Sequence, residues 1–312
     1  MRADLHIHSR YSDGRLWPAE LARLCVAAGL EAACLTDHDT LGGFPEFAEA
    51  ARSLELRTWP AVEIDCVDAS ISYKSEILAY FPDGRHEGTE AFLAAGRAER
   101  AARLAALFKR AAVLFGSPEM DFSAVIAQRM AGYPEGSPEL DPTMFRYAKT
   151  DVFLALREAG VVAKDLEYRE FKKAYFDTGL FSDVRFAKPE LGSVSELVTR
   201  DGGVLVAPHI AHEFGDSLQA MREGAGRLDA MLGRFRDLGV RGVELYNYRT
   251  PESEAINAFV VEQCKPFGFF QTYGSDFHGA STLKNGPGAF SGDFNGFSRK
   301  RRARKDKAWR TA

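Results

Sequence analysis

The sequence predicts an α/β protein: a barrel of parallel strands with helices outside it, divided by an inserted helical segment. Three observations support this prediction. Strand-like and helix-like segments alternate through the first part of the 312-residue chain, a long helical stretch follows, and the alternation resumes near Ser193. Strict alternation of strand and helix is typical of a parallel sheet with crossover helices. About seven strands are expected, which favours a closed barrel, although an open sheet is also compatible with the pattern.

The elements of the first part are recognised by their apolar periodicity and by the residues at their ends. Pro18 suits the first turn of a helix, and Gly29 suits the position after its last turn. Strands are expected over residues 2–8, 31–36, 58–64 and 75–80, and helices over residues 18–28 and 43–54.

The later elements follow the same rules on both sides of the helical stretch. Residues 87–179 are mainly helical, with one Pro- and Gly-rich break, GYPEGSPELDPT. After it we expect helices over 193–203, 218–238 and 251–265, and strands over 203–209, 242–247 and 267–279. The predicted domains are a discontinuous barrel (1–85 and 190–290), a helical insertion domain (86–189) and a basic, disordered tail (291–312).

Composition excludes several classes of protein. The chain is 46% hydrophobic and 27% charged, as in ordinary globular proteins, and no stretch is apolar enough to span a membrane. Asp4, His6 and His8 interrupt the place where a secretion signal would begin. The four cysteines are scattered, which predicts reduced thiols and a cytoplasmic location.

Charge is unevenly distributed along the chain. The formal net charge is -4, but residues 299–312 hold eight Lys or Arg against one Asp. The rest of the chain is therefore acidic, which is not typical of a general nucleic-acid binder. A contact between the basic tail and RNA remains an alternative. The sequence makes no prediction about oligomeric state.

Ionisable residues gather at predicted strand ends. The period of two in a strand puts Asp4, His6 and His8 on one face of residues 2–8, where Asp4 could accept a hydrogen bond from an imidazole N–H. Further His, Asp and Glu residues lie at or near the carboxyl ends of other strands: Asp37, His38, Asp39, Glu63, Asp65, Glu76, His209, Asp276 and His278.

These strand ends meet at one mouth in a parallel barrel, where active sites are built. Five of the seven histidines occupy such positions. If these histidines were unrelated surface or core residues, their placement at the ends of several strands would be a repeated coincidence. A mixed set of imidazole and carboxylate ligands suits Zn, Mn or Fe, and so many ligands predict more than one ion.

At this point the motifs resemble those of the PHP family of metal-dependent phosphoesterases. The matching segments are DLHIHSRYSDG (4–14), LTDHDT (35–40), AVEI (61–64), the strand 204–209, GVELYNYRTPE (242–252) and GSDFHG (274–279). The resemblance covers residues 1–83 and about 190–280, with the helical insertion placed as in the small-phosphatase branch. It implies a distorted (β/α)7 barrel with two or three divalent metal ions.

Carried across motif by motif, the resemblance implies three groups of ligands. His6, His8, Glu63 and Asp276 would hold the first ion. Asp13, His38 and His278 would hold the second. Glu63 and His209 would share a third with Glu76, which stands where the family usually has histidine. A glutamate there would favour harder ions such as Mn.

The resemblance also implies hydrolysis of a phosphomonoester, with a nucleotide or a small phosphorylated metabolite as substrate. His212 or Asp37 could protonate the leaving oxygen. The family's usual phosphate-binding arginine has no equivalent in APHIAH, so Arg249, Arg185 and Lys188 are the candidate substrate-binding cations.

Three other functions remain open. The same metals could support a phosphodiesterase or a 5′-end exonuclease acting on short RNA. An amidohydrolase would share the barrel and the metals, but it would typically place a lysine at a strand end, where this chain has none. A binding or regulatory module with a degenerate site is the alternative from another class.

Overall fold

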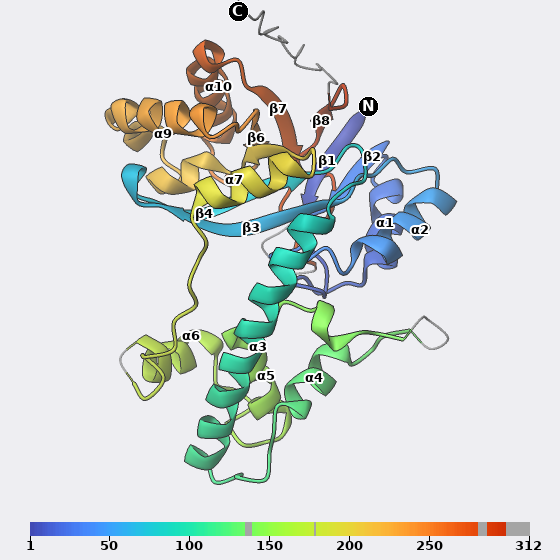
Figure 1. Ribbon diagram of the computed structural model, residues 1–312, viewed down its shortest axis with the longest axis vertical. Helices are drawn as coiled ribbons and strands as arrows, with labels where there is room; N and C mark the ends of the chain where they lie inside the picture. The colour runs from blue at the N-terminus through green and yellow to red at the C-terminus, as the bar shows by residue number, and fades with distance from the viewer. Residues whose placement is uncertain (135–138, 178, 280–285, 298–312) are drawn as a thin grey trace, which may run out of the picture.

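A computed structural model describes residues 1–134, 139–177, 179–279 and 286–297. The strands form two sheets, in the orders β2-β1-β8 and β3-β4-β5-β6-β7. Helices flank them on both sides, and a helical segment projects from one edge (Figure 1). The α/β class is confirmed.

The element bounds agree with the predicted periodicity to within a few residues, except in one helix. The strands are β1 (Arg2–Ile7), β2 (Ala32–Leu35), β3 (Ala61–Asp68), β4 (Tyr73–Tyr80), β5 (Val204–Ala207), β6 (Gly242–Tyr246), β7 (Phe270–Gly274) and β8 (Gly292–Asp293). The helices are α1 (Pro18–Ala27), α2 (Phe44–Ser53), α3 (Glu87–Leu114), α4 (Ser123–Met130), α5 (Lys149–Glu158), α6 (Tyr168–Phe171), α7 (Leu191–Arg200), α8 (Leu218–Glu223), α9 (Ala225–Asp237) and α10 (Ser253–Cys264). Short 3-10 turns are η1 (Ala69–Ile71), η2 (Pro142–Met144), η4 (Ile210–Phe214) and η5 (Lys265–Phe267), and η3 (Lys172–Asp177) is a π-helical turn.

The helix expected over 218–238 is divided in two at Gly224. A Cβ there would lie 2.8 Å from the ring of Phe214, so the chain needs glycine where α8 ends and α9 begins. Glycine is also a poor helix residue, which favours a break at this point.

The prediction that all strands run parallel is wrong. β4 runs antiparallel to both β3 and β5, whereas β1 with β2, β5 with β6 and β6 with β7 are parallel. Only four residues, 69–72, connect β3 to β4. A parallel connection needs a crossover of about a dozen residues or more, so this short turn can form only a hairpin.

Isolated bridges join the two sheets at both seams. His38 after β2 is paired with Glu63 on β3, and Ile7 on β1 is paired with Phe277 after β7. A cluster that includes Leu5, Leu78 and Val206 contains residues from both sheets. The ends of β1, β2, β5 and β7 and the first half of β3 therefore lie around one region, although no continuous ladder closes the ring.

The helical segment between β4 and α7 has an apolar core to which Tyr11 and Trp17, from the first part of the chain, also contribute. Leu107, Phe108, Phe153 and Phe171 are buried there, while Leu93 at the start of α3 belongs to the core beneath the large sheet. In the described part of residues 86–189 the only regular elements are helices. The division into a barrel and an insertion domain remains a prediction.

The region expected to be a tail from residue 291 begins with ordered structure. β8 pairs with β1 at Arg2 and Ala3, and Phe294 is buried. The strongly basic part, 299–312, lies outside the described residues. All four cysteines are buried free thiols. In the described ranges no helix has the length and apolar character needed to cross a membrane.

Candidate metal centre

The strands and the loops that follow them bring together nine His, Asp and Glu side chains in three neighbouring groups. Glu63 is the third residue of β3 and Glu76 lies in the middle of β4, so these two do not come from carboxyl ends as expected. Glu63 lies between the three groups. One of its carboxylate oxygens is 3.2 Å from His6 Nε2 and 3.3 Å from His8 Nε2, and the other is 3.2 Å from His209 Nε2. This is the position that the sequence predicts for a bridging carboxylate.

The first group consists of His6, His8 and Asp276, with Glu63 beside it. The two imidazoles project from the end of β1, as the strand period predicts. Asp276 Oδ1 lies 3.2 Å from His8 Nε2 and 3.7 Å from His6 Nε2. Both imidazoles are fully buried, so the group forms the floor of the centre.

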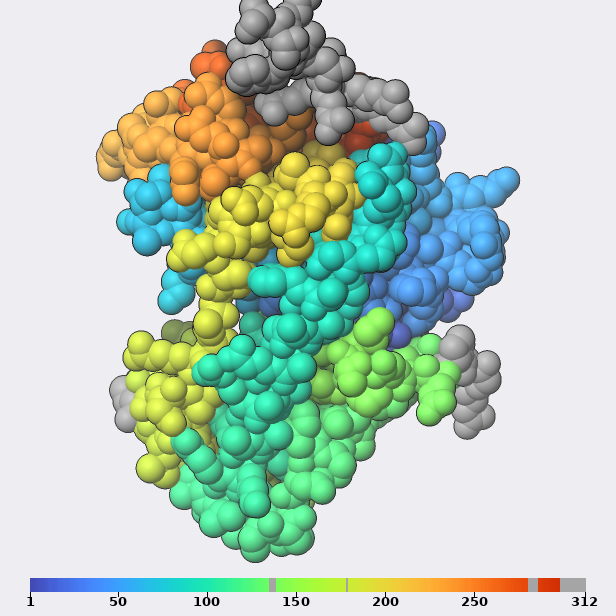
Figure 2. All heavy atoms as spheres, viewed as in Figure 1, coloured from blue at the N-terminus to red at the C-terminus, as the bar shows by residue number. Residues whose placement is uncertain are grey.

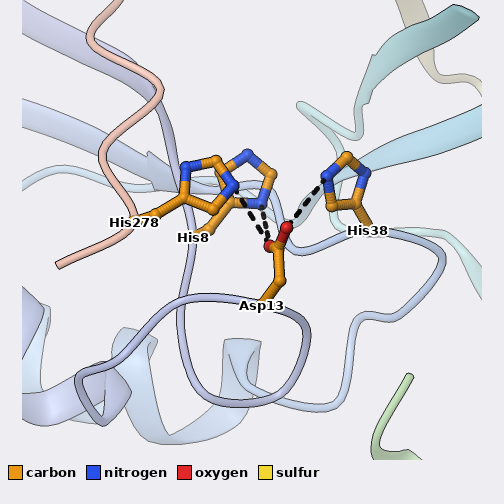
Figure 3. A group of neighbouring side chains, drawn as sticks. All are labelled: His8, Asp13, His38 and His278. Atoms are coloured by element: carbon orange, nitrogen blue, oxygen red, sulfur yellow. Dashed lines mark ion pairs between the residues drawn. The ribbon is translucent and has the colours of Figure 1, made fainter. Parts of the chain in front are cut away.

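The second group consists of His8, Asp13, His38 and His278. Figure 3 shows the carboxylate of Asp13 directed between the three rings. Asp13 lies 3.1 Å from His278 Nε2 and 3.7 Å from both His8 Nδ1 and His38 Nε2. The sequence analysis assigned His8 to the first group alone, whereas the structure places it between the two.

The third group consists of Glu63, Glu76 and His209. Because β4 is antiparallel, Glu76 reaches the centre from the middle of its strand and not from a carboxyl end as expected. One oxygen of Glu76 lies 3.3 Å from Lys188 Nζ, and the other accepts a hydrogen bond from Ser75 Oγ. Glu76 therefore lies beside two other predicted metal ligands, Glu63 and His209, and also contacts the ammonium group of Lys188.

Local backbone features explain two glycines of the motifs. A Cβ on Gly274 would lie 2.0 Å from Glu244 Oε1, and one on Gly14 would lie 2.3 Å from the carbonyl oxygen of His8.

Asp276 and His209 have positive φ angles of 49° and 25°, which are uncommon for residues with side chains. Such strain often accompanies functional sites, where it fixes the direction of a side chain.

The centre favours positive charge. Burial alone would lower the pKa of His6 and His8, but neighbouring carboxylates raise that of His6 well above its usual value and that of His8 to about 10. Burial would raise the pKa of Glu63 and Asp276, yet the imidazoles hold both well below their usual range. The donor set of imidazole and carboxylate groups thus fits divalent metal ions.

One further detail supports that fit. His8 Nδ1 is buried without a hydrogen-bond partner among the described residues. A buried imidazole nitrogen without a partner is costly unless it binds a ligand or solvent. His38 differs from the floor histidines, because burial lowers its pKa to about 4 and keeps the ring neutral, which is the ligating form.

Glu244 on β6 is a buried residue of the centre that the sequence analysis did not identify. Its Oε1 lies 2.9 Å from His6 Nδ1, and its Oε2 accepts a hydrogen bond from the backbone N–H of His209. A carboxylate acceptor keeps the proton of His6 on Nδ1, so Nε2 presents its lone pair to the centre. The feature of the sequence that could have identified Glu244 is an acidic residue within the otherwise apolar strand GVELYN.

Asp4 does not have the role expected for it. Its oxygens accept hydrogen bonds from the backbone N–H groups of Ser275 and Gly288, at 3.0 and 2.7 Å, and not from an imidazole. The strand period predicts the face on which Asp4 lies, but it does not predict whether a backbone N–H or an imidazole N–H donates to its carboxylate.

Replacing Glu244 with Gln is expected to lower both metal content and hydrolytic activity by about 10- to 100-fold, the range found for residues that orient metal ligands. A glutamine can donate its NH₂ to His6 Nδ1 and thereby favour the tautomer whose Nε2 carries a proton. Metal analysis and phosphate release on the same samples measure the effect. Glu254→Gln, at an exposed site on α10, is the control. Full metal content and activity in Glu244→Gln would contradict this role.

Asp37 is also placed differently from the prediction that it protonates a leaving group. Its oxygens accept hydrogen bonds from Ser9 N–H, Ser9 Oγ and Ser12 Oγ at 2.7, 2.6 and 2.5 Å. The residue is buried, and its hydrogen bonds hold the loop that carries Asp13. Asp37 therefore positions the loop, and the structure does not present it to the mouth.

His212 lies at the rim beside the third group. Its ring centroid is 4.5 Å from that of His209, and its Nδ1 is 2.5 Å from Asp216 Oδ1. Burial lowers the pKa of His212. Arg249 is close to the same rim: its Nη2 donates to the Tyr246 hydroxyl, which in turn donates to Asp276 Oδ2.

The other two predicted cations differ in their distance from the ligand groups. Lys188 Nζ contacts Asp65 Oδ1 at 3.0 Å as well as Glu76, so it neutralises carboxylates at the edge of the centre. Arg185 is exposed, and no contact links its side chain to the ligands in the described ranges. The sequence analysis missed Arg146, which contacts Asp65 at 2.7 Å and Asp39 at 3.3 Å.

Comparison with known proteins gives one family match. Residues 4–137 match the family model described as the PHP domain. The chain is 36% identical over 130 residues to an error-prone DNA polymerase from Mycobacterium tuberculosis, a match that spans 39% of this chain and only 11% of the polymerase.

Two relatives match over most of their length. The chain is 25% identical over 276 residues to a 3′,5′-nucleoside bisphosphate phosphatase from Chromobacterium violaceum, covering 88% of this chain and 86% of that protein. It is 23% identical to a phosphoribosyl 1,2-cyclic phosphate 1,2-diphosphodiesterase from Eggerthella lenta, covering 89% and 95%.

Among solved structures, the chain resembles a proposed metal-dependent phosphoesterase from Bifidobacterium adolescentis. The TM-score is 0.65 at 25% identity, over 91% of this chain and 90% of that one.

Proposed function

Because the chain carries a PHP domain, we propose that it is a metal-dependent phosphoesterase that hydrolyses a phosphomonoester, either a nucleotide or a small phosphorylated metabolite. The convergence of nine predicted ligands, with Glu63 between the three groups, is the observation that carries the proposal. A distorted (β/α)7 arrangement of the strands and a cytoplasmic location are parts of the same proposal.

The residues that would hold the metal ions follow from the three groups. His6, His8 and Asp276 would hold one ion, Asp13, His38 and His278 a second, and Glu76 and His209 a third, with Glu63 shared. Bound divalent ions supply charge neutralisation at the phosphoryl oxygens and lower the pKa of a water molecule for attack on phosphorus. Mn, Zn or Fe suits this donor set, and the two carboxylates of the third group favour Mn there.

The chain's own residues would orient the ester and transfer a proton. His212 Nδ1 is engaged by Asp216, so Nε2 is the nitrogen that would protonate the leaving oxygen. Arg249 would contact the phosphoryl group from the rim, where it already lies beside Tyr246. These assignments require the substrate to enter between the first and third groups.

Phosphate release from a panel of nucleotides and sugar phosphates tests the proposal. With Mn, Zn or Fe supplied, we expect release from at least one substrate. Treatment with a chelator should abolish it, and the metal should restore it. A metal-loaded sample that releases phosphate from no member of a broad panel would contradict the proposal and favour a binding module.

A phosphodiesterase is the second candidate, because one full-length relative is named a diphosphodiesterase. Product analysis on dinucleotides distinguishes the two functions. A phosphomonoesterase leaves the internal phosphodiester intact, whereas a phosphodiesterase or a 5′-end exonuclease releases mononucleotides.

A further inference from the structure

A cavity of about 340 Å³ lies between α3 and residues 186–189, beside the metal centre and outside it. Apolar side chains, among them Phe92, Leu93 and Phe186, line its walls. Its polar groups are the carboxylates of Asp39, Asp65 and Glu99 and the cations of Arg97, Arg100, Arg103 and Lys188. In Figures 1 and 2 the teal helix α3 and the yellow segment leading into α7 connect the two parts of the molecule.

The polar end of the cavity adjoins the metal centre. Asp39 follows His38 directly, and its backbone N–H donates to the carbonyl oxygen of Glu63 at 2.8 Å. Lys188 spans from the cavity to the third group through its contact with Glu76. A molecule whose phosphate lies at the centre can therefore extend its organic part into the cavity.

The walls suit a flat, apolar group. Phe92 is 40% exposed, although it is a large apolar residue. The guanidinium of Arg100 lies 4.5 Å from the ring centroid of Phe186. An aromatic ring and a stacked guanidinium are surfaces on which planar bases bind.

Gly96 gives an independent indication that this space is kept open. It lines the cavity from the interior of α3, where glycine is less favourable than alanine. A Cβ at this position would have no heavy atom within 4 Å, so packing does not require glycine. Gly96 also has a negative φ, so the backbone conformation does not require it either.

We propose that this cavity receives the nucleobase of a nucleotide substrate, a proposal that rests on the phosphoesterase function above. A second phosphate is a poorer fit, because the cations that line the cavity are already balanced by carboxylates: Arg97, Arg100, Arg103 and Lys188. Only Nη2 of Arg100 donates a hydrogen bond to a described residue, so its other N–H groups can bind the edge of a base. The carboxylates beside it are acceptors for amino groups.

The variant Gly96→Leu tests this assignment with two substrates that differ only in the base, AMP and ribose 5-phosphate. We expect kcat/KM for AMP to fall by about tenfold or more and that for ribose 5-phosphate to change by less than about twofold. The unfolding temperature should not fall, because leucine is the better helix residue. Gly226→Leu, in α9 and also with open space around its Cβ, is the control.

Equal losses for the two substrates, no loss for either, or a wild type that does not prefer AMP would overturn the assignment. Calorimetric titration with adenosine and with the three other common ribonucleosides separates it from the phosphoesterase proposal. Saturable binding to the wild type and its loss in Gly96→Leu would support the cavity even if no substrate were hydrolysed. Absence of binding for all four nucleosides would overturn it.

Discussion

Replacing Glu63 with Gln is expected to lower phosphate release by about a thousandfold. The carboxylate lies within 3.3 Å of nitrogens on four histidines, and these histidines belong to all three ligand groups. Its negative charge therefore contributes to metal binding in each group. Metal ions contribute several kcal/mol to stabilising charge in phosphoryl transfer, and a loss of about 4 kcal/mol corresponds to about a thousandfold in rate. Glutamine keeps the shape of the side chain, so the charge is the main change.

The measurement is kcat/KM on the best substrate, together with metal content. Glu46→Gln is the control, because Glu46 is partly buried, accepts a backbone hydrogen bond from Ala19 and belongs to none of the three ligand groups. The control should keep its activity. Activity near the wild-type level in Glu63→Gln, at unchanged metal content, would show that Glu63 does not bridge the groups.

The division of the ligands into groups came from the family resemblance, and two simple rules explain why most of those residues gather in one place. The strand period places His6 and His8 on one face, and sheet topology brings the ends of β2, β5 and β7 to the same region as Glu63 in the first half of β3. Glu76 lies in the third group although the predicted direction of β4 is wrong. A residue in the middle of a hairpin strand is close to the mouth whichever way the strand runs.

Residues that act through other residues were harder to predict. The role of Glu244 depends on which imidazole nitrogen it meets, and that of Asp37 depends on how the loop of Ser9 and Ser12 folds back. Neither is set by periodicity. Arg146 lies more than eighty residues from Asp65 in the chain, and only the packing of the helical segment against the strands brings them together.

Replacing Arg146 with Met is expected to lower the free energy of unfolding by about 3 kcal/mol. Arg146 contacts the buried carboxylate of Asp65 and the partly buried one of Asp39, and removing one partner of a buried ion pair leaves uncompensated charge. Arg100 and Lys188 still contact Asp65, which keeps the effect near the lower end of the range. Urea unfolding of the chelated protein at about pH 8 measures it, with the exposed Arg169→Met expected to stay within about 0.5 kcal/mol.

The pH dependence of that difference identifies its cause. In the wild type, burial and the charge of Asp65 raise the pKa of Asp39 to about 6, whereas Arg146 and Lys188 hold the pKa of Asp65 below its usual value against the effect of burial. Without Arg146 both pKa values should rise, and a carboxyl group whose pKa is raised on folding destabilises the protein most above that pKa. The cost of Arg146→Met should therefore be largest at about pH 8 and shrink as the pH falls towards about 5, because protonation removes the unpaired charges. A cost that stays constant over this range would assign the effect to lost packing and not to the two carboxylates.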